Sequence, residues 1–412
     1  MKILTGKIHI RLLQAVSLFL VTATGVLAAT GEPISLWEFD LDKVGYATGS
    51  GKNRGRGSAF DEPLFFLDDK TIAVTYPVVN SRIGLTTMGS PGGKYVFATV
   101  LLDVGSGEVR KQGTWGNVLD AFGIAPVSDS RSVVLDRIGI GLYDKSFSRL
   151  AQIPHQPDTV ATDGPPRSPQ SRKLFPDVNH DYRFLKPSLS GNTVVVVHTG
   201  GFTAIVHVFD SAKLDQVSEF KQQSAFYESS DASDTAFVFR RWKSDLPARA
   251  LLQMVSFRNE ANPTSTADDL GGCGEPRFIS EHLLLMTGYC SQLLLLNDKA
   301  QHVAAKDLDG FWAANPSPSR DGGRFVVDLF KVKASNPWLD RPPKLTDSHL
   351  VVYDTARLEP IFVLWPPPGP ITYRGSYALS PDGKLLAVLH DNRIMLYQLM
   401  DQVAQHGKPA AH

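Results

Sequence analysis

The sequence predicts an all-β protein, a β-propeller of seven blades in which a strand from the start of the chain completes the last blade. Three observations lead to this prediction. A strand–turn–strand pattern recurs seven times, an apolar run follows each turn, and one strand is spare at the beginning of the chain while one is missing at its end. With 412 residues, 27 prolines and 34 glycines, the chain has the length and the turn residues that many short strands need.

The clearest repeat unit spans residues 377–399, where two turns separate three short apolar segments. The first turn is Ser-Pro-Asp-Gly at 380–383, in which proline presets φ, aspartate bonds nearby backbone N–H groups and glycine takes a positive φ. His-Asp-Asn-Arg at 390–393 forms the second turn. The unit therefore predicts three antiparallel strands.

Similar first turns occur seven times along the chain. They lie at 68–70, 128–131, 190–192, 231–234, 280–282, 319–323 and 380–383. An apolar run follows each of them, and runs such as 194–197 and 283–286 are continuous rather than alternating. A continuous run predicts a strand that is buried on both faces, as it is between the packed sheets of a propeller.

The number of strands predicts how the ring closes. The last unit has only three strands before the end of the chain, whereas a propeller blade has four. Residues 34–41 alternate between two faces, as a strand does, and have no hairpin partner nearby. We therefore expect this segment to form the outer strand of the last blade and to remove an open sheet edge.

The turn sequences resemble a known class of repeats. Ser-Pro-Asp-Gly-Lys-Leu-Leu-Ala-Val at 380–388, Ser-Arg-Asp-Gly-Gly-Arg-Phe at 319–325 and Asp-Val-Gly-Ser-Gly-Glu-Val at 103–109 are similar to the WD40-like and YVTN-type repeats of secreted bacterial β-propellers. The resemblance implies the fold over nearly all of the chain after residue 28, and it implies no activity. The Trp-Asp and Gly-His pairs of true WD40 blades are absent from the sequence.

The first 28 residues have the three parts of a secretory signal peptide. Lys2, Lys7 and Arg11 are basic, residues 12–27 are mostly apolar, and small residues surround position 28. An uncleaved anchor is the alternative, but this apolar stretch is short for a span that needs about 20 residues. We predict a signal peptide over 1–28, a single propeller domain over 29–400 and a polar tail over 401–412. The protein is then periplasmic or extracellular, with no membrane span after cleavage.

The only two cysteines are Cys273 and Cys290. Residues 277–280 and 283–287 are predicted strands around a tight turn, and pairing residues whose numbers sum to 563 places the two cysteines opposite each other. Cross-strand neighbours can lie within disulfide range, and exported proteins fold in an oxidising compartment. We predict a disulfide, with two buried thiols as the alternative.

Charge and motifs identify neither a partner class nor a reaction. The chain has 42 basic and 42 acidic residues, so there is no whole-chain electrostatic case for nucleic acid or an anionic membrane. The glycine-rich segment 49–58 does not match a phosphate-binding loop. His198 and His207 flank a turn, yet the sequence has no metalloprotease motif and no nucleophile elbow. We predict no catalytic residue, no cofactor and no metal site.

Long connections are the best candidates for binding, because loops on a rigid scaffold often carry function. They lie at 155–181, 258–272 and 331–348. The last contains Trp338, Arg341 and Lys344, which we single out as a candidate binding loop; Trp312 and Trp365 lie in or beside the same unit.

We predict a monomeric, non-catalytic scaffold that binds a protein or a small-molecule ligand. The alternative is a propeller enzyme of the lactonase or hydrolase kind with its site in the central channel. An enzyme would bring carboxylates, histidine or arginine together at one mouth of that channel, whereas a scaffold would have small or apolar residues there.

Overall fold

The computed structural model describes residues 33, 35–45, 64–78, 95–118, 123–136, 138–154, 182–200, 203–223, 226–243, 246–257, 265–267, 270, 273–288, 290–333, 344–365, 377–390 and 392–399. The chain separates into two units, Met1–Ile34 and Ser35–His412, and all described strands belong to the second. The predicted signal peptide and polar tail lie outside the described residues. Within the part of the chain that is described, no helix has the length and apolarity to cross a membrane.

The described strands form seven antiparallel sheets of four strands each. The first three blades, in chain order, are β2 (Leu64–Asp68), β3 (Thr71–Val78), β4 (Tyr95–Asp103) and β5 (Val109–Val118); β6 (Gly123–Val127), β7 (Arg131–Leu135), β8 (Gly139–Tyr143) and β9 (Arg149–Pro154); and β10 (Tyr182–Pro187), β11 (Thr193–Gly200), β12 (Thr203–Asp210) and β13 (Gln216–Gln223). The next three are β14 (Phe226–Ala232), β15 (Ala236–Lys243), β16 (Leu246–Ser256) and β17 (Ser265–Ala267); β18 (Glu275–Ser280), β19 (Leu283–Thr287), β20 (Gln292–Asn297) and β21 (His302–Asp307); and β22 (Trp312–Pro318), β23 (Arg324–Lys333), β24 (Lys344–Asp354) and β25 (Glu359–Leu364). The seventh consists of β26 (Tyr377–Leu379), β27 (Leu385–His390), β28 (Arg393–Gln398) and β1 (Ser35–Asp40).

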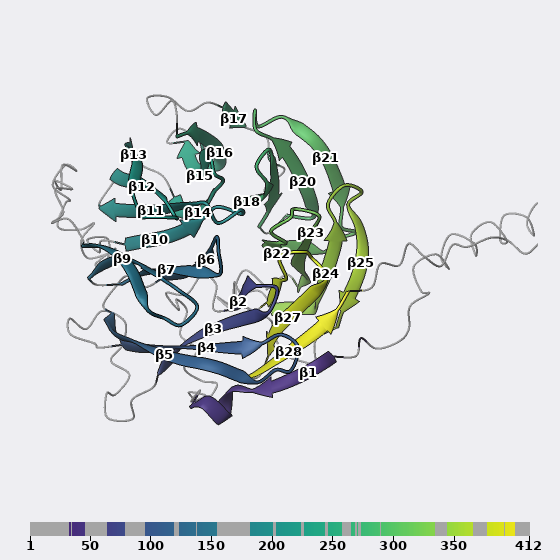
Figure 1. The fold of residues 1–412 in the computed structure, drawn as a ribbon. Helices are drawn as coiled ribbons and strands as arrows, with labels where there is room; N and C mark the ends of the chain where they lie inside the picture. The colour runs from purple at the N-terminus through teal and green to yellow at the C-terminus, as the bar shows by residue number, and fades with distance from the viewer. Residues whose placement is uncertain are drawn as a thin grey trace, which may run out of the picture. The chain divides into compact units, whose positions relative to one another are not determined.

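The first strands of the blades form a closed inner ring (Figure 1). β2, β6, β10, β14, β18, β22 and β26 each contact the next, and β26 contacts β2 again. This arrangement is a seven-bladed β-propeller, as the sequence predicts.

The N-terminal strand closes the ring as expected. β1 pairs with β28 in the antiparallel direction, with Trp37 opposite Leu396 and Phe39 opposite Ile394. Both aromatic side chains pack against the apolar cluster that joins the seventh blade to the first. A short 3-10 helix, η1 (Leu41–Val44), follows β1 and buries Leu41 in the same cluster.

The core lies between the blades. Each of the seven clusters of buried apolar side chains among the described residues joins two adjacent blades. In β11, Val195 and Val197 pack toward the fourth blade while Val194 and Val196 pack toward the second. The continuous apolar run therefore has the predicted cause, burial on both faces, and each fully buried valine contributes roughly 1.5–3 kcal/mol.

Serine and aspartate stabilise the first turns of the last two blades in the same way. The Ser319 hydroxyl donates to Asp321 Oδ1 across 2.6 Å, and the Ser380 hydroxyl donates to Asp382 Oδ1 across 2.7 Å. In both turns the serine oxygen also accepts a backbone N–H five residues further on. These local bonds satisfy backbone donors that no strand partner reaches.

The strand directions define two faces of the propeller. The turn face carries the connections between first and second strands and between third and fourth strands, and the loop face carries the others. At the loop face, β9, β23 and β25 end and β10, β24 and β26 begin; these strands flank the segments 155–181, 334–343 and 366–376. The segment 258–272 differs from the prediction of a loop, because it contains β17, the outer strand of the fourth blade.

The structure contains the disulfide between Cys273 and Cys290, with 4.9 Å between the Cα atoms. The predicted register that led to it is wrong by one. Arg277 pairs with Leu285, so paired numbers sum to 562, and an irregularity between Phe278 and Ser280 shifts the pairing near the turn. The cysteines lie beyond the ends of the paired strands, and both are buried.

Candidate functional site

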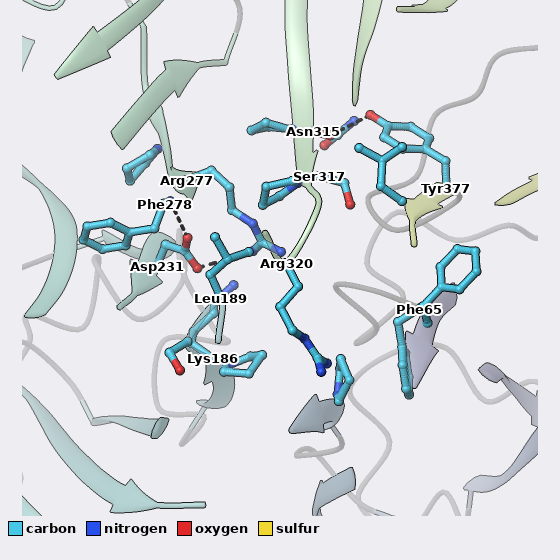
Figure 2. Close-up of a pocket in the computed structure, with 18 of the residues that line it drawn as sticks. Phe65, Lys186, Leu189, Asp231, Arg277, Phe278, Asn315, Ser317, Arg320 and Tyr377 are labelled. Atoms are coloured by element: carbon cyan, nitrogen blue, oxygen red, sulfur yellow. Dashed lines mark hydrogen bonds and ion pairs between the residues drawn. The ribbon is translucent and has the colours of Figure 1, made fainter. Parts of the chain in front are cut away.

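A cavity of about 130 Å³ lies within the central channel (Figure 2). Every blade contributes to its wall, through its first strand or the turn after it. One lining residue from each blade, in order, is Leu64, Pro126, Lys186, Asp231, Arg277, Arg320 and Leu379.

Six prolines line this cavity, at positions 126, 187, 276, 316, 318 and 381. The first strand of each blade is an edge strand, because no further strand of its own sheet lies on its channel side. Proline has no N–H to offer a pairing strand and is tolerated at such edges. Five of these prolines lie in β6, β10, β18 and β22, and they remove backbone donors from these four inner edges.

Two carboxylates of the cavity wall bind backbone groups of the next blade. Asp231 Oδ2 accepts the Phe278 N–H across 2.7 Å, and Glu275 Oε2 accepts the Asn315 N–H across 3.2 Å. The Tyr377 hydroxyl similarly donates to the Asn315 carbonyl oxygen across 2.6 Å. These contacts join blades four to seven along the channel, so both carboxylates have a structural role.

Three basic side chains line the same cavity. Lys186 is 4% exposed, and Arg277 Nη1 lies 3.4 Å from Asp231 Oδ1. Burial lowers the pKa of Arg320, while the charges of Asp69 and Asp68 act in the opposite direction. Figure 2 shows the Arg277 and Arg320 side chains extending into the middle of the cavity. The wall thus carries three basic and two acidic groups.

A second feature lies in the sixth blade, at the loop face. The blade-six patch consists of Phe311, Lys331, His349 and Trp365. Trp365 is 63% exposed and stacks on His349, with ring centroids 4.4 Å apart and planes 27° apart. His349 in turn meets Phe311 edge to face at 5.0 Å. One face of the Trp365 ring is therefore fixed on a buried support.

Charge surrounds this aromatic stack. Lys331 Nζ lies 4.4 Å from the centre of the Phe311 ring and 3.7 Å from a carboxylate oxygen of Asp347. Burial lowers the pKa of His349, which favours the neutral imidazole. The patch combines an exposed aromatic ring with an ion pair beside it.

The predicted binding loop falls mostly outside the described residues. Trp338 and Arg341 lie there, and Lys344 opens β24, where it pairs with Lys333. The binding role of these three residues stays a prediction. Trp365, from the same unit, is exposed, whereas Trp312 is half-buried in the blade near Phe330.

The two histidines noted in the sequence lie on adjacent strands of the third blade. His207 Nδ1 lies 3.3 Å from Glu219 Oε2 on the outer strand, and His198 is buried. Across the residues that the structure describes, no three His, Cys, Asp or Glu side chains are grouped so that they could hold a metal ion.

Sequence reasoning missed the basic residues of the channel. Lys186, Arg277 and Arg320 lie 134 positions apart from first to last, and only closure of the ring brings them to one cavity. A usable signal exists, because each lies in the first strand of a repeat unit or in the turn after it, where side chains can face the channel.

The fold and the channel define the protein as a seven-bladed β-propeller. No protein-family model and no curated protein sequence matches the chain. Raptor from Chaetomium thermophilum is similar over 89% of this chain and 29% of its own, with a TM-score of 0.55 and 11% identity. A chain of the mitotic checkpoint complex matches over 91% of this chain and 98% of its own, with a TM-score of 0.50 and 14% identity. The C-terminal WD40 domain of Sif2 matches over 90% and 99%, with a TM-score of 0.46 and 9% identity. At these identities the likeness to Raptor and to the chain of the mitotic checkpoint complex shows the fold alone.

Proposed function

We propose that this protein is an exported, non-catalytic scaffold that binds a protein partner through the blade-six patch. The observation that carries the proposal is Trp365, which is 63% exposed although it is stacked in a fixed orientation on His349. Exposed tryptophan residues held on a rigid support are typical anchors of protein interfaces, since they bury a large area at a small entropic cost.

The surroundings of Trp365 support a protein partner. The patch lies at the loop face, where β23 and β25 end and β24 begins. The strands on either side of the predicted binding loop, which contains Trp338, Arg341 and Lys344, therefore meet the same face. The ion pair between Lys331 and Asp347 offers polar contacts at the edge of the aromatic surface.

Export and a monomeric state are parts of the same proposal. The signal-like sequence of residues 1–28 and the disulfide between Cys273 and Cys290 support export. The cavity does bring arginines and carboxylates together, as the lactonase or hydrolase alternative would require. Asp231 and Glu275, however, accept hydrogen bonds from backbone groups of neighbouring blades, which supports a structural role for both carboxylates.

The test is capture of the partner by the tagged full chain from its native envelope and culture fluid. We expect one protein to be recovered in stoichiometric amount by the wild type. Truncation of an anchor tryptophan costs 2 kcal/mol or more, so Trp365→Ala should weaken the affinity for that protein about 30-fold or more.

Ile138→Ala is the matched control. Ile138 is 62% exposed and lies in the second blade, between β7 and β8, also at the loop face. Its truncation should leave partner recovery unchanged. Equal recovery by Trp365→Ala and the wild type, or the absence of any stoichiometric protein, would show that the patch is not a protein-binding site.

A further inference from the structure

The central cavity collects basic side chains from three blades, and the proposed protein-binding role leaves them unused. Lys186 belongs to the inner strand β10, Arg277 to β18, and Arg320 to the turn that follows β22. Burying a cation is costly unless an anion accompanies it. The position of the acidic groups in the wall therefore decides how much of this positive charge is balanced.

The acidic groups of the wall balance the positive charge only in part. Asp231 lies beside Arg277, and its second oxygen accepts the Phe278 N–H. Glu275 accepts the Asn315 N–H, and its charge also acts on Arg240. The two carboxylates thus also take part in blade-to-blade contacts, and the charge of Glu275 acts on a fourth cation, Arg240.

Arg320 is the basic residue least balanced by the carboxylates around it. Its guanidinium feels the charges of Asp69 and Asp68. Asp68, however, accepts the Lys70 N–H across 2.8 Å within its own turn, and Asp69 is exposed to solvent. Among the described residues no carboxylate forms an ion pair with Arg320. A planar fork of donors therefore projects into the cavity with capacity for an incoming acceptor.

We propose that the central cavity binds a small oxyanion, a carboxylate or a phosphate, through Arg320, Arg277 and Lys186. The two guanidinium groups match the paired oxygens of such anions, and the ammonium group adds a point charge. Prolines and the Phe65 and Tyr377 side chains in the wall reduce the local polarity and so strengthen these contacts. The volume of about 130 Å³ offers space for on the order of ten water-sized groups, which is enough for phosphate or a small dicarboxylate.

Calorimetric titration and thermal unfolding of the purified full chain test this proposal. The probes are inorganic phosphate, succinate and citrate, each compared with chloride at equal ionic strength. We expect one saturable site per chain and a melting temperature that rises with the logarithm of the anion concentration. Saturation by phosphate alone identifies a phosphate ligand, and saturation by the carboxylates alone identifies an organic acid.

Arg320→Gln should weaken the binding at least tenfold, and Arg320→Lys, which keeps the charge but loses the fork, should lie between the two. Arg149→Gln is the matched control, because Arg149 is an exposed arginine on the outer strand β9. Circular dichroism verifies that each variant is folded. Should Arg320→Gln fail to fold, Lys186→Gln takes its place with the same expected loss.

Two results would overturn the proposal: equal stabilisation by chloride and the oxyanions, or unchanged affinity in folded variants of both Arg320 and Lys186. Its failure is separable from failure of the protein-binding proposal. Trp365→Ala should bind the anion as the wild type does, and Arg320→Gln should recover the protein partner as the wild type does.

Discussion

The indole Nε1 of Trp37 donates a hydrogen bond to the carbonyl oxygen of Val104 across 2.6 Å. Trp37 lies in the outer strand of the seventh blade, and Val104 follows β4 in the first blade. This bond and the packing of the Trp37 ring against the shared apolar cluster attach the start of the chain to both blades that it joins.

Trp37→Ala should lower the free energy of unfolding by about 3 kcal/mol, because it removes the half-buried ring and one hydrogen bond. Trp37→Phe keeps most of the ring and should cost about 1 kcal/mol. Urea unfolding monitored by circular dichroism measures both. Leu36→Ala, on the neighbouring exposed position of the same strand, should change stability by less than about 0.5 kcal/mol. An equal loss for Leu36→Ala and Trp37→Ala would contradict the specific role of Trp37.

Alanine substitutions at Gly322 and Gly310 distinguish the cost of backbone strain from the cost of steric overlap. Both have positive φ, at +72° and +80°, but a Cβ at Gly322 would overlap the Ile279 carbonyl oxygen, whereas a Cβ at Gly310 meets nothing within 4 Å. Gly310→Ala should therefore cost about 1 kcal/mol for the strained backbone alone.

Gly322→Ala should cost about 3 kcal/mol, because a turn of the sixth blade must then move away from the fifth. Thermal and urea unfolding of the two variants side by side provide the comparison. Equal losses would mean that the contact between the turn and Ile279 adjusts freely.

Asp328 should make stability depend on pH. This residue in β23 is 4% exposed, and its carboxylate accepts a hydrogen bond from the Ser348 hydroxyl across 3.0 Å. Burial raises the pKa of Asp328 from 3.8 to about 7. The folded protein therefore holds this proton more tightly than the unfolded chain does. The contribution of Asp328 to stability is fully present below about pH 4 and is lost as the pH rises toward 7.

Asp328→Asn should remove this dependence. At pH 8 the variant should be more stable than the wild type, by at most about 4 kcal/mol, and at pH 4 the difference should nearly vanish. Urea unfolding at pH 4, 6 and 8 measures the difference between the two proteins. A difference that does not change with pH would show that Asp328 ionises in the folded protein as it does in water.

Reduction of the disulfide should destabilise the fold without changing its architecture. Cys273 and Cys290 are 17 positions apart, and the chain-entropy model gives roughly 3 kcal/mol for a loop of this length. The double variant Cys273→Ala/Cys290→Ala should show the same loss, and added reductant should no longer affect it. A reductant-sensitive melting temperature in the double variant would contradict this assignment.

The fold could be predicted because it depends on local patterns. Turns such as Ser319–Asp321 are stabilised by side chains two residues apart, and the runs of valine in β11 need only a neighbouring blade on each side. The register around the cysteines could not be predicted, because a single irregularity between Phe278 and Ser280 shifts every pair from Phe278 back to Glu275 by one. Nothing in the residue types there marks the shift.

The candidate site was harder to predict for a related reason. Arg277 and Arg320 come from two successive blades, 43 positions apart, and Lys186 comes from a third, so no short window of sequence contains the site. Trp365 is different: it directly follows a strand and precedes three prolines, a sequence context that is typical of loops and favours an exposed ring. Trp365 lies in the same repeat unit as the predicted binding residues Trp338, Arg341 and Lys344, whose role stays a prediction.

The pairing of β1 with β28 also sets the order in which the molecule can be completed. Glu38 and Arg393, which form an ion pair at this junction, are 355 positions apart, so the earliest-made strand must wait for almost the whole polypeptide before its neighbour exists. Until β1 pairs with β28, the seventh sheet has an open outer edge, and β1 from a second copy could pair with β28 instead. Refolding at low protein concentration should therefore favour monomers, and refolding at high protein concentration should favour oligomers in which the chains exchange β1.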